Sequence, residues 1–330
     1  MDANPVRRAV TDLASREGFG PVTIDDRAIT ALATTIAEEP LSLPAWETPA
    51  IPDADAVGAD TLFDLLVVAN ALNFQFDHYD TGETFATTYD GDRYTGAFGL
   101  LACFTRALAA GTPVTSPSYL ANLDREDVAV LLAGEPPMPR LPDRHRILRH
   151  VGTRLQALPG DGVYDALQTT GPVPTFDDGD GLVEFLVRAF PAAYNDVRTV
   201  DGHTVPFYKK AQLAAALLAG HFGETTHGVT DLGSLTLFAD YVIPAVLRDA
   251  GVLTYAEDLA DRVDDGRVLP VGSAAEVGIR AATVAAGDRL VEAVTDRRTD
   301  TVTAVHLDQY LWRSGRLEGV TFHRTPTTSY

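Results

Sequence analysis

Apolar residues recur at spacings of three and four along most of the chain, which is the period of helices that bury one face. We expect a helix capped by Thr23 or Asp25 that runs through Ala37, and a strongly apolar helix over residues 59–72. Further segments with this spacing are 98–109, 125–132, 144–158, 182–189, 208–219, 274–294 and 302–312. The chain is therefore predicted to be mainly helical.

Two short segments instead alternate polar and apolar residues, and each contains an Asp-Gly pair. They cover residues 83–95 around Asp90-Gly91, and residues 197–207 around Asp201-Gly202. This pattern predicts two β-hairpins closed by tight turns. No Gly/Ser-rich or Pro-rich linker divides the sequence, and no internal repeat is visible. We therefore expect one helical domain over residues 1–330 with two small hairpins.

The net charge of the chain indicates the solvent in which the protein works rather than the kind of partner that it binds. The formal net charge is −20, and the acidic residues are spread along the sequence without an acidic tail. Dispersed carboxylates with scarce lysine are typical of proteins from a high-salt cytoplasm, where salt screens their mutual repulsion. Direct nucleic-acid binding needs a clustered basic face, so this composition disfavours it.

Common catalytic motifs are absent from the sequence. It has no G-x-G-x-x-G, no P-loop, no G-x-S-x-G and no H-E-x-x-H motif, and we expect no cofactor and no metal. The single cysteine, Cys103, allows no disulfide within the chain and is predicted to be a core residue. Without a signal-like N-terminus or an apolar run of about 18 residues, the protein is expected to be cytoplasmic, with no membrane partner.

The chain has only two lysines, the adjacent residues Lys209 and Lys210. All the other residues in its Lys and Arg count are arginines. An ammonium group is a compact point charge that can meet one phosphate oxygen, whereas guanidinium is a planar fork. The pair can mark an anion site, or a helix start can simply tolerate two lysines. We favour an anion site for Lys209 and leave both interpretations open for Lys210.

Asp240 is the most isolated acid, since it lies in the apolar segment Leu-Thr-Leu-Phe-Ala-Asp-Tyr-Val-Ile-Pro. A buried carboxylate needs a partner, and it can stabilise a cation that develops in a reaction. It can equally cap a helix that begins near Pro244. Asn73 is similar, because this amide ends an apolar helix between aromatic residues that include Phe74 and Phe76. Aromatic faces stack on flat heterocycles, and an amide can pair with a base edge.

Several stretches occur together in one order from residue 72 to the C-terminus. They are Leu-Asn-Phe-Gln-Phe at 72–76, Tyr-Thr-Gly at 94–96, Arg-Ala-Leu at 106–108, Pro-Val-Thr-Ser at 113–116 with Tyr119, Arg-His-Arg-Ile-Leu at 144–148, Phe-Tyr-Lys-Lys-Ala-Gln at 207–212, Phe-Ala-Asp-Tyr at 238–241, Glu-Val-Gly-Ile-Arg at 276–280, Leu-Asp-Gln-Tyr-Leu-Trp at 307–312 and Phe-His-Arg at 322–324. As an ordered set, they resemble the queuosine salvage family, the queuosine 5′-phosphate N-glycosylases that release queuine.

The resemblance implies a single, largely helical domain that is remotely similar to helix-hairpin-helix DNA glycosylases. It also implies that Asp240 is the essential carboxylate, which stabilises positive charge on the ribose as the glycosidic bond breaks. The base is a 7-deazapurine without N7, so hydrogen bonds to its other atoms must assist its departure. Asn73 and a second acid such as Asp308 are the candidates, and Phe74 or Phe76 would stack on the base.

The nucleotide phosphate carries about two negative charges and needs cationic or hydrogen-bonding partners. The resemblance assigns this contact to Lys209, with Tyr208, His323 and Arg324 as helpers. The expected partner is a small-molecule nucleotide, either queuosine 5′-phosphate or a related 7-deazaguanine nucleotide. Two alternatives stay open, namely a glycosylase that acts on a modified base in DNA or tRNA, and a non-catalytic protein that binds a 7-deazaguanine nucleotide.

Overall fold

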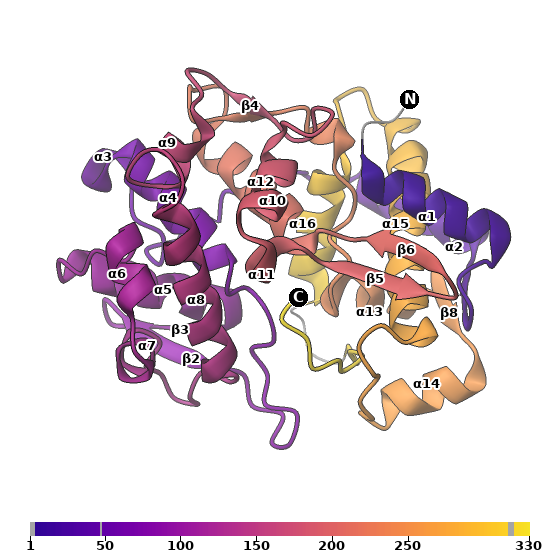
Figure 1. Ribbon diagram of the computed structural model, residues 1–330. Helices are drawn as coiled ribbons and strands as arrows, with labels where there is room; N and C mark the ends of the chain where they lie inside the picture. Colours follow the sequence, from indigo (N-terminus) through magenta and orange to yellow (C-terminus); the bar gives the residue numbers. More distant parts are fainter. Residues whose placement is uncertain (1–3, 47, 316–319) are drawn as a thin grey trace.

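The computed structural model describes residues 4–46, 48–315 and 320–330, and helices make up most of its regular structure (Figure 1). The first helices are α1 (Pro5–Arg16), α2 (Asp26–Ala37), α3 (Ala54–Val57), α4 (Ala59–Asn70), α5 (Gly96–Ala109), α6 (Pro117–Asn122), α7 (Arg125–Leu131), α8 (Leu141–Leu155) and α9 (Val163–Leu167). They are followed by α10 (Leu182–Ala189), α11 (Pro191–Tyr194), α12 (Lys209–Phe222), the short 3-10 helix η1 (Leu232–Ser234), α13 (Val242–Asp249), α14 (Glu257–Asp264), α15 (Ala274–Thr295) and α16 (Ala304–Gly315). The prediction of a mainly helical chain is confirmed.

Strands occur in pairs throughout the described part of the chain. The pairs are β1 (Val22–Ile24) with β8 (Leu253–Tyr255), β2 (Ala86–Tyr89) with β3 (Asp92–Thr95), β4 (Val173–Pro174) with β7 (Val229–Thr230), and β5 (Val197–Val200) with β6 (His203–Pro206). Both predicted hairpins are present as β2–β3 and β5–β6. Their turns need positive φ, which is 50° and 86° at Asp90-Gly91 and 48° and 81° at Asp201-Gly202.

The helices predicted from apolar spacing are all present, although some of their ends differ. The helix α8 begins at Leu141, earlier than expected, because Arg140 takes a left-handed backbone conformation and Pro142 fits the first turn without needing an N–H partner. The pattern missed α1, which buries only three residues. A cap defines its start, since the Val6 N–H donates to Asn4 Oδ1 at 2.8 Å.

Two large hydrophobic clusters divide the molecule into two halves. The first contains the apolar faces of α4, α5, α8, α10 and α12, together with buried Cys103, and the second is formed mainly by α2, α13, α15 and α16. Figure 1 shows α4 to α9 on one side, and α1, α2 and α13 to α15 on the other. The C-terminal segment lies between them, and its last residue, Tyr330, is buried. None of the described helices has the length and apolar character to cross a membrane.

Candidate functional site

A cavity of about 770 Å³ lies where the two halves meet. Its walls come from the loop after α4, the first turn of α12, the segment before α13, and α16. The residues singled out from the sequence that line it are Asn73, Phe74, Phe76, Lys209, Asp240 and Asp308. Cavities of roughly 300–1,000 Å³ are the usual sites for small molecules, so this one has room for a nucleotide.

Two buried cations hold the loop that carries the aromatic residues. The Arg144 guanidinium donates to three backbone carbonyl oxygens of this loop at 2.8 to 3.1 Å, and Lys210 Nζ donates to the Ala71 carbonyl oxygen at 2.7 Å. Both cations also lie over the Phe74 ring, at 4.1 and 4.9 Å from its centroid. Burial lowers the pKa of Arg144 to about 9. The two cations therefore fix the loop backbone and position Phe74 at the cavity wall.

Lys209 and Lys210 occupy the first turn of α12, where the helix dipole disfavours cations. The Lys210 side chain binds the loop after α4, whereas Lys209 faces the cavity and places its Nζ 3.6 Å from Asp240 Oδ2. One turn later, Gln212 Oε1 accepts from the Thr236 N–H at 3.0 Å. This contact fastens the start of α12 to the segment that ends in Asp240.

Asp240 is 7% exposed, and its two oxygens have different partners. Oδ1 accepts from the N–H groups of Val242 and Ile243 at 2.8 and 3.1 Å, which caps the start of α13. Oδ2 points to Lys209, and the side chain lines the cavity. The two interpretations left open by the sequence are therefore compatible, because one oxygen caps a helix while the other faces the ammonium.

Asp308 is a second buried acid at the same cavity, contributed by α16. Its Oδ2 accepts from the Phe238 N–H at 2.8 Å, two residues before Asp240. Burial, and then the negative charge of Asp240, raise the pKa of Asp308 well above its usual value. These surroundings favour the protonated form of the Asp308 carboxyl.

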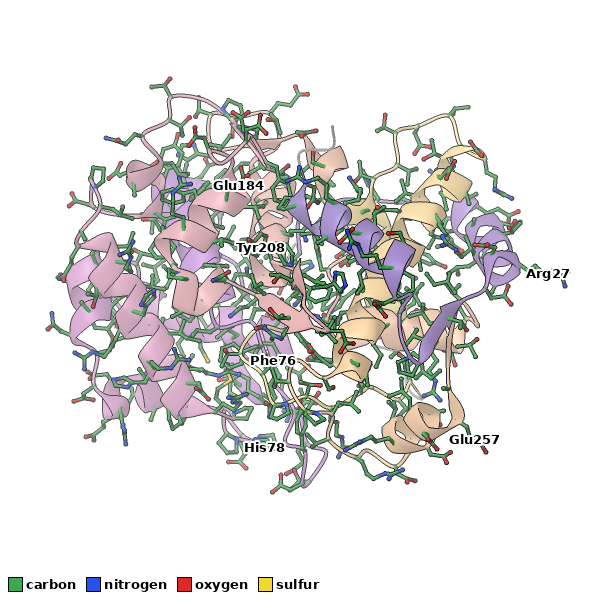
Figure 2. All side chains as sticks on the ribbon, turned by 45° about the vertical axis from the view of Figure 1, so that its right-hand side comes forward. Arg27, Phe76, His78, Glu184, Tyr208 and Glu257 are labelled. Carbon is green, nitrogen blue, oxygen red and sulfur yellow. The ribbon has the colours of Figure 1, made fainter. Side chains whose placement is uncertain are left out.

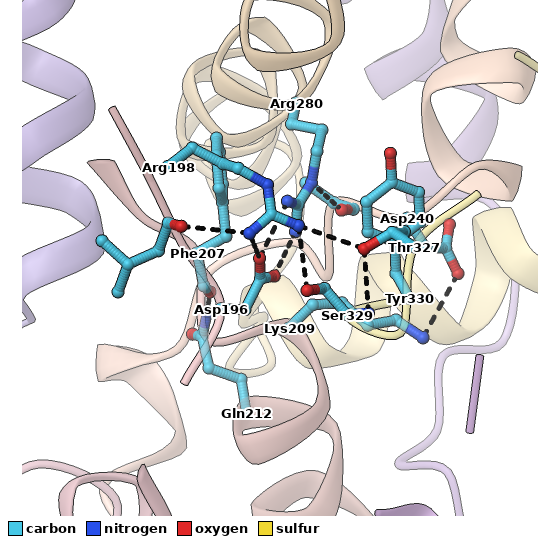
Figure 3. Close-up of polar contacts among 12 residues, drawn as sticks. Asp196, Arg198, Phe207, Lys209, Gln212, Asp240, Arg280, Thr327, Ser329 and Tyr330 are labelled. Atoms are coloured by element: carbon cyan, nitrogen blue, oxygen red, sulfur yellow. Dashed lines mark hydrogen bonds and ion pairs between the residues drawn. The ribbon is translucent and has the colours of Figure 1, made fainter. Parts of the chain in front are cut away.

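A buried ionic network lies next to Asp240, and Figure 3 shows contacts within it. Arg280 donates to both oxygens of Asp196 and pairs with Glu276 at 3.3 Å. Its Nε donates to the Ala239 carbonyl oxygen at 2.8 Å, which fixes the backbone next to Asp240. Asp196 holds the pKa of Arg280 above its usual value, and Arg280 holds the pKa of Asp196 below its usual value. Glu276 and Arg280 lie in one of the ordered stretches of the sequence, whereas Asp196 lies outside them and was missed.

The same network fastens the C-terminal segment. The Arg280 guanidinium lies 4.3 Å from the centroid of the Tyr330 ring, and Tyr330 Oη donates to Glu276 Oε1 at 3.1 Å. Arg198 donates to the hydroxyl oxygens of Thr327 and Ser329 at 3.1 and 2.9 Å. These contacts keep the Tyr330 side chain at the wall of the cavity.

Three of the predicted phosphate helpers lie elsewhere. His323 and Arg324 line a neighbouring cavity of about 440 Å³, and burial lowers the pKa of His323 to about 3, so its imidazole is neutral. Arg324 donates to the Tyr79 carbonyl oxygen at 2.8 Å. Tyr208 is half-buried and is labelled in the middle of the molecule in Figure 2, as is Phe76, but Tyr208 does not line the large cavity.

An aromatic wall closes another side of the large cavity, and the sequence analysis missed it. Trp46 stacks on Trp312 with ring centroids 5.3 Å apart, and its Nε1 donates to Gln309 Oε1 at 3.2 Å. All three residues line the cavity. Trp46 lies in a Pro-rich connection without helical periodicity, so no pattern marked it. Trp312 was visible only as part of the same ordered stretch as Asp308.

The cavity thus combines two buried carboxyl groups, a lysine side chain and aromatic faces. In the part of the chain that the structure describes, no three His, Cys, Asp or Glu side chains are grouped as a metal site would require. A buried carboxylate that lines a cavity suits a reaction that builds positive charge on its substrate. The aromatic faces suit a flat heterocycle, and the ammonium suits an anion.

Comparisons with known proteins show the family of the chain. The family model described as queuosine salvage protein matches residues 54–330. A protein of Sphaerobacter thermophilus named queuosine 5′-phosphate N-glycosylase/hydrolase is 37% identical over 94% of this chain and 93% of its own length. Proteins of the same name from Bos taurus and Mus musculus are 30% and 32% identical, over 95% and 80% of this chain and 96% and 80% of their own lengths. The chain belongs to the queuosine salvage protein family.

Proposed function

We propose that this protein hydrolyses the N-glycosidic bond of queuosine 5′-phosphate and releases queuine. The observation that carries the proposal is Asp240, which is buried in the cavity with one oxygen fixed by two N–H groups and the other beside Lys209. The names of relatives that cover nearly the whole chain support the same substrate and reaction. We also propose that residues 1–330 act as one domain, because the cavity is lined by residues from Pro44 to Tyr330.

The proposed reaction passes through an oxocarbenium-like state. As the bond between C1′ and N9 breaks, positive charge builds on the ribose, and the Asp240 carboxylate stabilises it. The helix cap and the contact of Arg280 with the neighbouring backbone hold this carboxylate, so it needs little reorganisation when the charge develops. In this scheme the stabilising charge comes from the protein, and no metal is required.

The remaining candidates are assigned to the two ends of the nucleotide. The base would stack on Phe74 or Phe76, and Asn73 would bind the edge of the base. Because Asn73 Nδ2 already donates to Asn70 Oδ1 at 3.1 Å, the Asn73 side-chain oxygen is left to accept from the base. The phosphate would meet Lys209, whose ammonium has three donors and can serve both Asp240 and one phosphate oxygen.

Tyr208, His323 and Arg324 stay candidates for helping at the phosphate. Since His323 is neutral, it would act as a hydrogen-bond partner rather than as a counter-charge. Arg324 would reach the substrate only through the neighbouring cavity, which shares Tyr241 and Phe322 with the large one.

Incubation of the purified protein with queuosine 5′-phosphate in high salt tests the proposal. Chromatography should show free queuine and ribose 5-phosphate appearing in equal amounts. A folded protein that releases no queuine would contradict the proposal. Tight binding measured by calorimetry without release would instead favour a nucleotide-binding protein.

A further inference from the structure

The large cavity contains two carboxyl groups, and their surroundings differ. Asp240 accepts two N–H donors and faces Lys209 Nζ at 3.6 Å. Asp308 accepts one N–H donor, from Phe238, and is as buried as Asp240, with 7% of its surface exposed. The charged groups that act on Asp308 are Asp240, which opposes its ionisation, and Lys209, which favours it less strongly.

Such a pair is the arrangement that enzymes use to separate an acid from a base. Two carboxyls whose surroundings move their proton affinities apart take different roles, and the one that keeps its proton can give it to a leaving group. Both Asp240 and Asp308 line the cavity, and the hydrogen bond from Phe238 ties them to the same short segment. Of these two carboxyls, the reaction proposed above uses only Asp240, although the family resemblance made Asp308 a candidate hydrogen-bond partner of the departing base.

We propose that Asp308 is the general acid that protonates the departing base, a role that rests on the proposed function. The C1′–N9 bond breaks with its electron pair moving to the base, and the Asp308 carboxyl donates its proton to a heteroatom of that base. Water adds to C1′ and gives one proton to Asp240. Transfer of that proton through the cavity or solvent restores Asp308, so that one water is consumed for each queuine and ribose 5-phosphate formed.

The chemistry of the base explains why this acid is needed. A 7-deazapurine has carbon in place of N7, so it lacks the atom at which ordinary purines are most readily protonated. Its departure as an anion is slow unless a donor acts at another position. General acids contribute about 10²- to 10⁴-fold to such steps.

The Asp308→Asn variant separates this role from a structural one. Asparagine can keep the hydrogen bond from Phe238 and can still donate to the base, but it cannot release a proton. We expect kcat for queuosine 5′-phosphate to fall by about 10²-fold or more, with KM nearly unchanged. On 4-nitrophenyl ribofuranoside 5-phosphate, whose leaving group needs no proton, the fall should be less than about tenfold.

The control is Asp296→Asn, which makes the same charge change at an exposed position after α15. It should leave kcat and KM for both substrates unchanged. Equal losses on both substrates with Asp308→Asn would overturn the role of Asp308 and leave the proposed function standing. Absence of queuine release by the wild-type protein would overturn the proposed function as well.

The pH dependence of the wild-type protein gives a second measurement that does not depend on the folding of a variant. Because the protonated carboxyl is the active form, kcat for queuosine 5′-phosphate should fall as pH rises through the pKa of Asp308. The nitrophenyl substrate should show no such fall. A queuosine 5′-phosphate profile that stays flat from neutral to alkaline pH would contradict the proposal.

Discussion

The exchange Asp240→Asn isolates the charge of the carboxylate from its structural role. Asparagine caps helices about as well as aspartate, so the bonds to the N–H groups of Val242 and Ile243 can persist. What disappears is the negative charge that the proposed mechanism places beside the ribose. At about 4 Å and an effective dielectric constant near 20, a unit charge pair is worth about 4 kcal/mol. Since about 1.4 kcal/mol equals a factor of ten, we expect kcat to fall by roughly 10³-fold.

The same exchange has a smaller cost for stability. Lys209 loses its carboxylate partner in a buried place, and an unsatisfied buried group costs about 1–3 kcal/mol. Queuine release in a single turnover, nucleotide affinity by calorimetry and denaturant unfolding measure the three effects separately. The matched control is Asp249→Asn, at the exposed end of the same helix, α13. Turnover by Asp240→Asn within about tenfold of the wild type would refute the electrostatic role.

Further predictions concern the surroundings of the cavity and one distant acid. Replacing Arg280 with Leu removes the main partner of the buried Asp196 and should destabilise the fold by about 3–5 kcal/mol in denaturant titrations; a loss below about 1 kcal/mol would contradict the network. Burial raises the pKa of Asp64 to about 7, so the folded state binds a proton more tightly than the unfolded state, and stability should fall between about pH 4 and pH 7. Asp64→Asn should flatten this dependence, and an unchanged slope would contradict it. Trp46→Ala removes one ring of the aromatic wall, and loss of a stacking contact with the substrate worth about 0.5–1.5 kcal/mol should raise KM up to about tenfold, with kcat nearly unchanged. An unchanged KM would place the substrate away from this wall.

Much of the fold could be predicted because its helices bury regular apolar stripes. The two hairpins were marked by Asp-Gly turns, which the positive φ values at both positions confirm. Elements that depend on distant partners left no local signal. The strand pairs β1–β8 and β4–β7 join residues far apart in sequence. The helix α14 was missed for a different reason, since it buries only two residues and its apolar pattern is therefore weak. The likeness to helix-hairpin-helix glycosylases and a high-salt origin stay predictions.

The site was predictable where a polar residue stands alone among apolar ones. Asp240 and Asn73 were found in this way, and the scarcity of lysine marked Lys209. The open question about Lys210 has a structural answer, since its ammonium binds the Ala71 carbonyl oxygen and faces Phe74. Arg280 lies four residues after Glu276 on the same helix, whereas its other acidic partner, Asp196, comes from another part of the chain. Sequence spacing cannot reveal such a pairing.

A crystal structure of Asp240→Asn with intact queuosine 5′-phosphate tests the central claim most directly. The account predicts that the nucleotide fills the cavity between the two halves, with C1′ within about 3.5–4 Å of the residue 240 side chain. The phosphate should lie toward Lys209. A nucleotide bound elsewhere, or one whose ribose faces away from residue 240, would contradict the account.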